Sequence, residues 1–427
     1  MSATRFDRRH TDDLISYVAA SPSPYHAVDQ AATLLRQAGF SEVAETEEWD
    51  DRPGGRYVVR AGSIVAWHVP EGAAVSAGFR IFGSHTDSPN LRVKPRPDTG
   101  SAGWRQIAVE VYGGVPRDTW LDRDLGLSGR LITRDGTTRL VMVDEPLLRV
   151  PRLAIHLDRE VNDGQVLDAQ NHMTPIWGLG EPEEGELIEF IAERAGLPAA
   201  DVAGWDLMAH DVQRPAYLGR DAELLACPRL DNLVSVHAGV AAMTEAARRP
   251  GERVAIMAAF DHEECGSDSY SGAGGPFLDT VLRRLLAARG ANTQDVARAF
   301  ADSMVMSSDT GHSVHPNYVD RHEPGHQPVA GGGPILKVNV NQRYATDGAG
   351  RAVFVAACER AGVEWQFYVN RNSMPCGSTI GPITATRLGV LTVDVGIACL
   401  SMHASRELCS AEDPPRLAST AVEFLTG

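Results

Sequence analysis

The feature that most constrains the fold is a series of short apolar runs, each ended by a polar cluster. They lie at residues 79–82, 254–260, 304–306 and 390–395. Continuous apolar runs of this length are typical of strands buried on both faces. Helical patterns alternate with these runs, at residues 11–39 (with a break at the Ser-Pro-Ser-Pro of 21–24), 233–248 and 280–289. The alternation predicts an α/β domain with a mostly parallel central sheet flanked by helices.

A middle segment has a different pattern. Short strand-like runs lie at 107–112, 129–133 and 139–143, and Asp135-Gly136 between the last two is a hairpin signal. One amphipathic helix, 186–195, is followed by Gly196, a residue typical of helix C-termini. At 427 residues the chain exceeds what one core usually serves. We therefore expect a β-rich domain of residues 96–222 inserted into an α/β domain of residues 1–95 and 223–427.

Composition excludes several classes of protein. The net charge of −16 disfavours nucleic acid or an anionic membrane as a partner. No apolar run approaches the roughly 20 residues of a membrane span, and the N-terminus lacks the apolar core of a signal peptide. The six cysteines form no CxxC pair. These observations predict a cytoplasmic protein.

The first two polar clusters contain His85 and Asp231. His85 follows the run at 79–82, and Asp87 is close enough to reach the second imidazole nitrogen and fix its tautomer. Asp231 precedes the helical pattern at 233–248, where capping of the helix is the default role. A carboxylate that bridges two cations is the sharper alternative.

The other three clusters follow the remaining apolar runs. After 254–260 come Glu263 and Glu264, which project in different directions, so Glu264 could bind metal while Glu263 stays free as a general base. After 304–306 come Asp309 and two histidines, His312 and His315, of which at most one or two residues are expected to be ligands. After 390–395 comes His403, which alone would be interpreted as structural.

Convergence decides between these alternatives. In open α/β sheets ligands bind outside the carboxyl ends of the strands, where these clusters are expected to meet. Two imidazoles and three carboxylates without sulfur suit a pair of divalent ions, with zinc expected and cobalt or manganese as alternatives. Two cations about 3.5–4 Å apart are a recurrent hydrolytic device in aminopeptidases.

Over nearly its full length, the chain resembles the aspartyl aminopeptidase family of zinc metallopeptidases. The motifs that carry the resemblance are GSHTDSPNLRVKP, LAIHLDR, CPRLDNL, DHEECGS, SVHPNY, LKVNVNQRYAT and LSMHASRE. Many relatives carry Met-Ala where this chain has Thr310-Gly311, between Asp309 and His312. The resemblance implies a zinc-dependent aminopeptidase that removes N-terminal residues, with a preference for Asp or Glu, from peptides with a free N-terminus.

The resemblance also implies roles for the clustered residues. Asp231 would bridge the two ions, with His85 and Asp309 on one ion and Glu264 and His403 on the other. Glu263 would be the general base that takes a proton from the activated water. Asp87 would orient His85.

His156 and the assembly are a further implication. His156 lies in the middle segment, where a partly buried structural histidine is the plain interpretation. In similar proteins the corresponding histidine reaches an active site, including that of a neighbouring subunit, and stabilises the tetrahedral intermediate. A role as metal ligand is the weaker alternative. The resemblance implies a homo-oligomer formed through the inserted domain, up to a dodecamer.

Substrate binding is expected at Lys337, Tyr344 and His312. Relatives hold substrate with the matching lysine and tyrosine, which fits an acidic first residue, whereas a lysine with its ammonium in solvent is the plain alternative. Lys337 and Tyr344 have opposite parity, so a regular strand would direct them to opposite faces. Either the chain bends between them or Arg343 recognises the acidic group.

Two rival functions remain. A related two-metal carboxypeptidase or amide deacylase would act on N-blocked substrates instead of free amines. A catalytically silent metal-binding assembly protein would have no need for a free carboxylate such as Glu263 beside the ligands.

Overall fold

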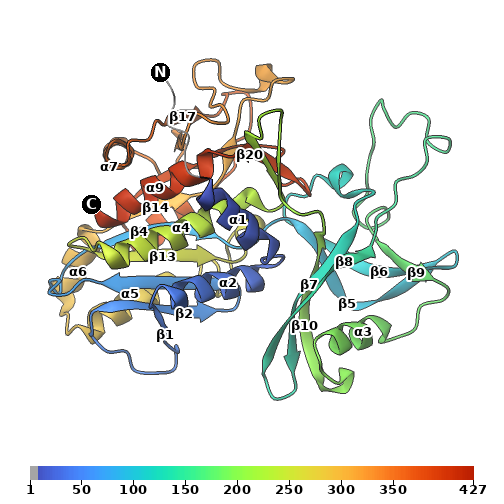
Figure 1. The fold of residues 1–427 in the computed structure, drawn as a ribbon, viewed down its shortest axis with the longest axis horizontal. Coiled ribbons are helices and arrows are strands. Elements are labelled where there is room, and N and C mark those ends of the chain that lie inside the picture. The colour runs from blue at the N-terminus through green and yellow to red at the C-terminus, as the bar shows by residue number, and fades with distance from the viewer. Residues whose placement is uncertain (1–7) are drawn as a thin grey trace.

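The computed structural model describes residues 8–427, which form an α/β part and a β-rich part side by side (Figure 1). The α/β part is built on a nine-stranded sheet of order β1-β2-β3-β13-β4-β14-β18-β16-β17. Its strands are β1 (Ser41–Glu42), β2 (Gly54–Arg60), β3 (Ser63–Val69), β13 (Val254–Phe260), β4 (Phe79–His85), β14 (Met304–Ser308), β18 (Leu391–Gly396), β16 (Ile335–Val338) and β17 (Gln366–Val369).

The four predicted apolar runs are the centre of this sheet. They form β13, β4, β14 and β18, which are neighbours, and each adjacent pair is parallel. Every residue of β13 and β14 is buried, as expected for strands covered on both faces. The predicted mostly parallel central sheet is thus confirmed.

Helices cover both faces of the sheet. One face packs against α1 (Arg9–Ala19), α2 (Pro24–Gln37), α4 (Leu230–Arg248), α7 (Gly348–Ala361) and α9 (Asp413–Thr426). The other packs against α5 (Phe277–Ala288), α6 (Thr293–Ala301) and α8 (Ile380–Leu388). The predicted break in the first helical pattern is confirmed, since Ser23 caps α2 by accepting from the His26 N–H and Pro24 occupies the first turn.

The β-rich part is a six-stranded antiparallel sheet of order β8-β7-β10-β5-β6-β9. Its strands are β5 (Asn90–Ser101), β6 (Trp104–Tyr112), β7 (Leu125–Thr133), β8 (Thr138–Leu148), β9 (Ile176–Leu179) and β10 (Val202–Asp211). Gly136, at a φ of 83°, turns the predicted hairpin between β7 and β8. The predicted helix is α3 (Glu186–Arg194), which buries Leu187 and Ile191 in this core.

Strand β5 enters the second sheet at Asn90, before the boundary predicted at residue 96. We therefore keep as a proposal the division into a discontinuous domain of residues 1–95 and 223–427 and an inserted domain of residues 96–222. Residues 1–7 of the first domain lie outside the described part of the chain. Within residues 8–427, no helix combines the length and the apolar character needed to cross a membrane.

A small third sheet lies next to the carboxyl edge of the central sheet. Its order is β11-β12-β20-β19-β15, with β11 (Ala216–Leu218), β12 (Leu224–Cys227), β20 (Glu407–Ser410), β19 (Ala398–Leu400) and β15 (Gly311–His312). Because β12 leads into α4 and β19 and β20 flank His403, this sheet places two of the predicted site segments side by side.

Candidate metal centre

Five polar side chains meet at the carboxyl ends of the central strands. His85 is the last residue of β4, Glu264 lies in the turn η3 (Glu263–Cys265) after β13, and Asp309 follows β14. Because β13, β4 and β14 are parallel neighbours, these residues emerge at one edge of the sheet. Asp231 joins them from the first turn of α4, and His403 joins from the loop between β19 and β20.

Asp231 lies between the two imidazoles. Its Oδ1 is 3.2 Å from His85 Nε2, and its Oδ2 is 3.4 Å from His403 Nε2. Asp309 Oδ1 lies 3.6 Å from His85 Nε2, whereas Glu264 Oε2 lies 3.3 Å from His403 Nε2. The arrangement thus has two ends, with one imidazole and one further carboxylate at each and Asp231 between them.

Both imidazoles are held through the opposite ring nitrogen. His85 Nδ1 is 3.0 Å from the main-chain oxygen of Asp87, and His403 Nδ1 is 3.2 Å from that of Gly114. A carbonyl only accepts, so each Nδ1 carries a proton and, in the neutral ring, each Nε2 lone pair faces the carboxylates. Both rings have the tautomer that a cation at Nε2 requires.

The buried charges of the cluster strongly perturb one another. Burial would lower the pKa of His85, but Asp231, Asp309 and Asp87 outweigh it and hold that pKa well above its usual value. Burial, with the charge of Asp231 second, raises the pKa of Glu264 well above its usual value. Burial also raises the pKa of Glu263 to about 8, with added repulsion from Asp309. Carboxylates this close resist joint ionisation unless a cation lies among them.

The residues fit divalent cations. Ligand atoms of His85, Asp231 and Glu264 lie within 4.8 Å of one another. Asp231 Oδ1 and Glu264 Oε1 are buried and accept no hydrogen bond from the described residues. Buried carboxylate oxygens without donors are costly, whereas a metal ion satisfies them. Nitrogen and oxygen donors without sulfur are compatible with zinc.

Asp87 connects the two sides of the centre. Its Oδ1 is 3.4 Å from His85 Nδ1, although the main-chain oxygen of Asp87 is the closer partner of that nitrogen. The carboxylate also accepts the main-chain N–H groups of Glu263 and Glu264 at 3.1 and 3.0 Å. It therefore fixes the turn that carries both glutamates as well as facing His85.

Glu407, the last residue of the LSMHASRE motif, has a role that the motif alone did not indicate. Its buried carboxylate accepts the main-chain N–H of Asp231 at 3.0 Å and that of His403 at 2.7 Å. One side chain thus holds together two segments 172 residues apart in the chain. Its position four residues after His403 was the one sequence signal for a contact with that residue. The hydrogen bond to Asp231 can be recognised only in the folded chain.

The second sheet reaches the centre at two points. Tyr112, at the end of β6, donates its hydroxyl to Asp87 Oδ2 at 2.6 Å. Gly114, two residues on, provides the carbonyl that holds His403. The guanidinium of Arg92, from β5, lies 3.8 Å from the centre of the Tyr112 ring. No sequence pattern indicated that these three residues belong to the site.

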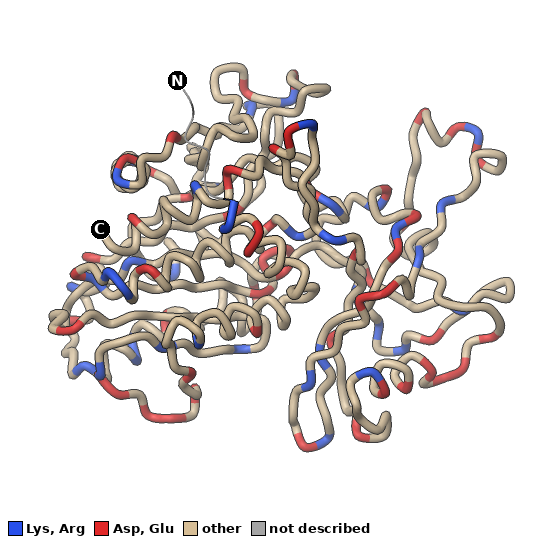
Figure 2. Tube along the Cα trace, in the orientation of Figure 1, with Lys and Arg blue, Asp and Glu red and all other residues tan. Residues whose placement is uncertain are grey.

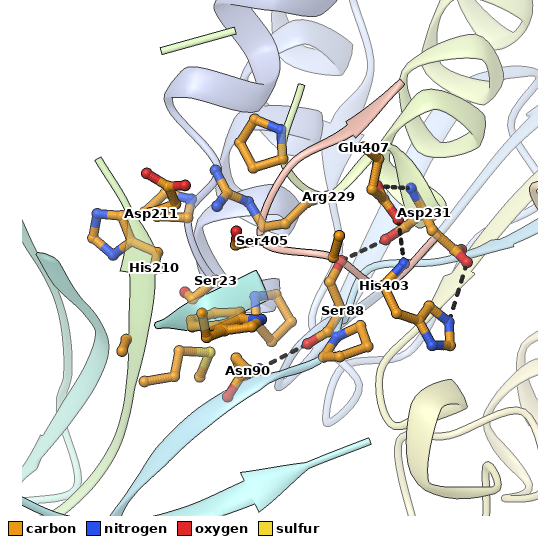
Figure 3. Close-up of a pocket in the computed structure, with 18 of the residues that line it drawn as sticks. Ser23, Ser88, Asn90, His210, Asp211, Arg229, Asp231, His403, Ser405 and Glu407 are labelled. Atoms are coloured by element: carbon orange, nitrogen blue, oxygen red, sulfur yellow. Dashed lines mark hydrogen bonds and ion pairs between the residues drawn. The ribbon is translucent and has the colours of Figure 1, made fainter. Parts of the chain in front are cut away.

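A small cavity lies behind the cluster, between α2 and the two sheets (Figure 3). Its volume is about 30 Å³, enough for a water molecule or two. Ser88, which lines it, donates its hydroxyl to the main-chain oxygen of Asp231 at 2.6 Å, and Asn90 donates to the main-chain oxygen of Ser88 at 2.7 Å. This chain of hydrogen bonds holds Asp231 from the side opposite Glu407.

The predicted substrate residues lie beside Asp309. Lys337 is almost fully buried, donates to the Thr310 oxygen at 2.6 Å and approaches Asp309 Oδ2 at 4.0 Å. The Lys337 Nζ lies 5.4 Å from the centre of the Tyr344 ring. The two side chains therefore meet despite their opposite parity, because β16 ends at Val338 and the chain turns before Tyr344. The alternative, Arg343, donates instead to the Gly377 oxygen at 3.3 Å.

His312 and His156 occupy different surroundings. His312 lies in β15, paired with Cys399 of β19, and is exposed. His156 is also exposed, in the long segment between β8 and β9 that projects at the upper right of Figure 1. Within the described chain, His156 does not lie with the five residues of the metal cluster.

A mixed sheet whose parallel strands present imidazoles and carboxylates at one edge defines the class of metal-dependent α/β hydrolases. Within that class, the family model described as Aminopeptidase I zinc metalloprotease (M18) matches residues 17–424. The chain belongs to the M18 aminopeptidase family and is a zinc metallo-aminopeptidase. This family is favoured over the alternatives of a two-metal carboxypeptidase, an amide deacylase and a catalytically silent metal-binding protein.

Three similar proteins illustrate the relationship. A probable M18 family aminopeptidase 2 of Streptomyces avermitilis is 63% identical over 99% of this chain and 99% of its own. The structure of Ape4 in complex with Nbr1 is 33% identical, with a TM-score of 0.94 over 98% of this chain and 85% of that chain. The S. cerevisiae mApe1 dodecamer is 27% identical, with a TM-score of 0.84 over 98% of this chain and 96% of that chain.

The position of Asp231 between the two imidazoles leads to a prediction about metal content. Asp231→Ala should lose both ions, because it removes the one carboxylate that faces both ends of the cluster. His403→Ala should mainly empty the end that it shares with Glu264. Metal per chain, measured by elemental analysis of the purified variants, distinguishes the two results. Retention of two ions by Asp231→Ala would reduce that residue to a helix cap.

Proposed function

We propose that the chain removes the first residue of peptides with a free N-terminus at a centre of two divalent cations, zinc in the first instance. Asp231 would bridge them, His85 and Asp309 would hold one, and Glu264 and His403 would hold the other. The supporting observation is that the two oxygens of Asp231 face different imidazoles. Cobalt or manganese would suit the same donors.

The chemistry divides between the ions and the chain. When bound, the cations supply Lewis acidity, which polarises the scissile carbonyl and acidifies an attacking water. Glu263 accepts the proton of that water and passes it to the departing amine. Asp87 holds the Glu263 main chain, and Glu407 and Ser88 keep Asp231 in place.

Glu263→Gln should keep its metal and its fold but lose most activity, because an amide cannot accept the proton. Removal of a general base typically lowers the rate by about 10²- to 10⁴-fold. Steady-state kinetics with an aminoacyl anilide, together with metal analysis, checks this. Glu264→Gln, one residue along, is the matched contrast and should lose metal as well as rate. Turnover by Glu263→Gln near the wild-type rate would refute the assigned base.

A preference for Asp or Glu as the first residue rests on Lys337, Tyr344 and His312. Lys337 is a buried cation. It lies beside Asp309, at the end of the cluster that contains His85 and Asp309. Desolvated ammonium groups bind carboxylates more strongly than exposed ones do. A substrate carboxylate that reaches this ammonium is therefore favoured over an apolar side chain.

Lys337→Met should reduce kcat/KM for an aspartyl anilide by about 10- to 100-fold, as expected for a lost charge-assisted hydrogen bond. The value for a leucyl anilide should fall much less. Lys94→Met removes the only other lysine of the chain and is the matched control. An equal loss on both substrates would show that Lys337 acts through Asp309 and does not select acidic residues.

We further propose a cytoplasmic homo-oligomer, as large as a dodecamer. The segment between β8 and β9 exposes several apolar side chains, with exposed fractions of 53% for Leu153 and Ile155, 75% for Leu157 and 90% for Val166. Exposed apolar groups gathered on one segment are typical of an interaction surface. The six cysteines are free, as in a reducing compartment.

In this assembly His156 stabilises the tetrahedral intermediate in the site of a neighbouring subunit. His156→Phe should lower the catalytic rate and leave zinc content unchanged. Mixing it with Glu263→Gln should partly restore activity, because an intact His156 from one chain then meets an intact Glu263 from another. His326→Phe, at another exposed histidine, is the control. Failure of rescue despite demonstrated subunit mixing would confine His156 to its own chain, and a loss of metal would make it a ligand.

A further inference from the structure

A second cavity, of about 340 Å³, is lined by His312, three residues after Asp309, and by Ser401, two residues before His403. Its walls are His312 of β15, the following segment as far as His322, the end of β17 with the residues that follow it, and β19. The ring of Tyr368, in its wall, lies close to the rings of two proposed substrate residues. The Tyr368 ring lies 6.0 Å from that of His312 and 6.1 Å from that of Tyr344, and Tyr368 is paired with Lys337 across β16 and β17.

The lining of this cavity is cationic. It includes Arg321 and Arg371 and contains no Asp or Glu. Basic and acidic residues are interspersed along the chain, whose net charge is −16 (Figure 2). A carboxylate-free pocket with two guanidinium groups favours an anionic occupant.

The guanidinium groups keep donors for such an occupant. Arg371 donates through Nη1 to the Asp320 main-chain oxygen at 2.6 Å and through Nε to Ser373 Oγ at 2.9 Å. Its Nη2 makes no hydrogen bond to the described residues. Arg321 lies 3.9 Å from the Asp320 carboxylate, which is too far for a hydrogen bond.

Two histidines of the same wall are also donors. The His322 Nε2 accepts the main-chain N–H of His315 at 3.1 Å, and the His315 Nδ1 accepts that of Asn317 at 3.2 Å. Each ring therefore carries its proton on the other nitrogen when neutral. The wall thus combines guanidinium and imidazole N–H donors.

We propose that this cavity binds a carboxylate of the peptide substrate downstream of the residue that is removed. The inference rests on the proposed function, in which Lys337 receives the first side chain close to Asp309. Arg371 lies three residues after Tyr368, which is paired with Lys337, and Arg321 lies nine residues after His312. The carboxylate is either an acidic side chain at the next positions or the C-terminus of a short peptide.

Four substrates with the same first residue test the proposal. They are aspartyl anilide, Asp-Ala-Ala amide, Asp-Glu-Ala amide and Asp-Ala-Ala with a free C-terminus. The wild-type enzyme should cleave at least one of the two carboxylate-bearing peptides with a kcat/KM about 10-fold or more above the neutral amide. Preference for Asp-Glu-Ala amide identifies the side chain as the source, and preference for the free acid identifies the C-terminus.

Arg371→Ala and Arg321→Gln should each remove most of that preference and leave kcat/KM for the anilide within about twofold. Arg321→Gln keeps the test decisive if Arg371→Ala disturbs the turn that Arg371 holds. Arg220→Ala, at a side chain 91% exposed and outside the cavity, is the matched control.

Equal kcat/KM for neutral and carboxylate-bearing peptides in the wild-type enzyme would overturn the inference. Losses in the variants that are equal for anilide and peptides would also overturn it, since they indicate a general effect on the site. Failure of the proposed function has a different signature, which is no turnover of any of the four substrates.

Discussion

The confinement of several carboxylates in one buried volume is the constraint on which the rest of the site depends. Asp231, Glu264, Asp309 and Asp87 converge within reach of two imidazoles. Repulsion among these carboxylates would push apart the loops that carry them unless nearby donors or cations compensated each charge. Main-chain N–H groups donate hydrogen bonds to Asp87, and an imidazole lies close to each oxygen of Asp231. Asp231 Oδ1 and Glu264 Oε1 still accept no hydrogen bond from the described residues, which leaves cations as their natural partners.

Much of the central sheet follows from local sequence. The apolar runs that became β4, β13, β14 and β18 specify strands buried on both faces, and parallel order then brings their polar ends to one edge. Local sequence also places His85, Glu264 and Asp309 there, because His85 ends its strand, Asp309 directly follows its strand and Glu264 comes four residues after its strand. The third sheet, made of very short strands, gave no such signal.

The contacts that sequence patterns did not reveal are those between distant segments. Glu407 holds Asp231 across 176 residues, and the Tyr112 hydroxyl reaches Asp87 from another sheet. No periodicity encodes such pairs, since they depend on how two sheets pack. The conflict of parity between Lys337 and Tyr344 had a similar origin. The strand ends after Val338, so the alternation rule does not extend to Tyr344.

The carbonyl of Gly114 has a consequence for how the two parts of the chain relate. It holds the imidazole of His403 from the segment that follows β6 of the second sheet. A Cβ at Gly114 would lie 3.1 Å from that imidazole, so the approach is close on the main-chain side as well. The β-rich part is therefore not an interchangeable module attached to a finished enzyme. Any recombination that replaced it would have to reproduce one main-chain oxygen at one position, which ties the histories of the two parts together.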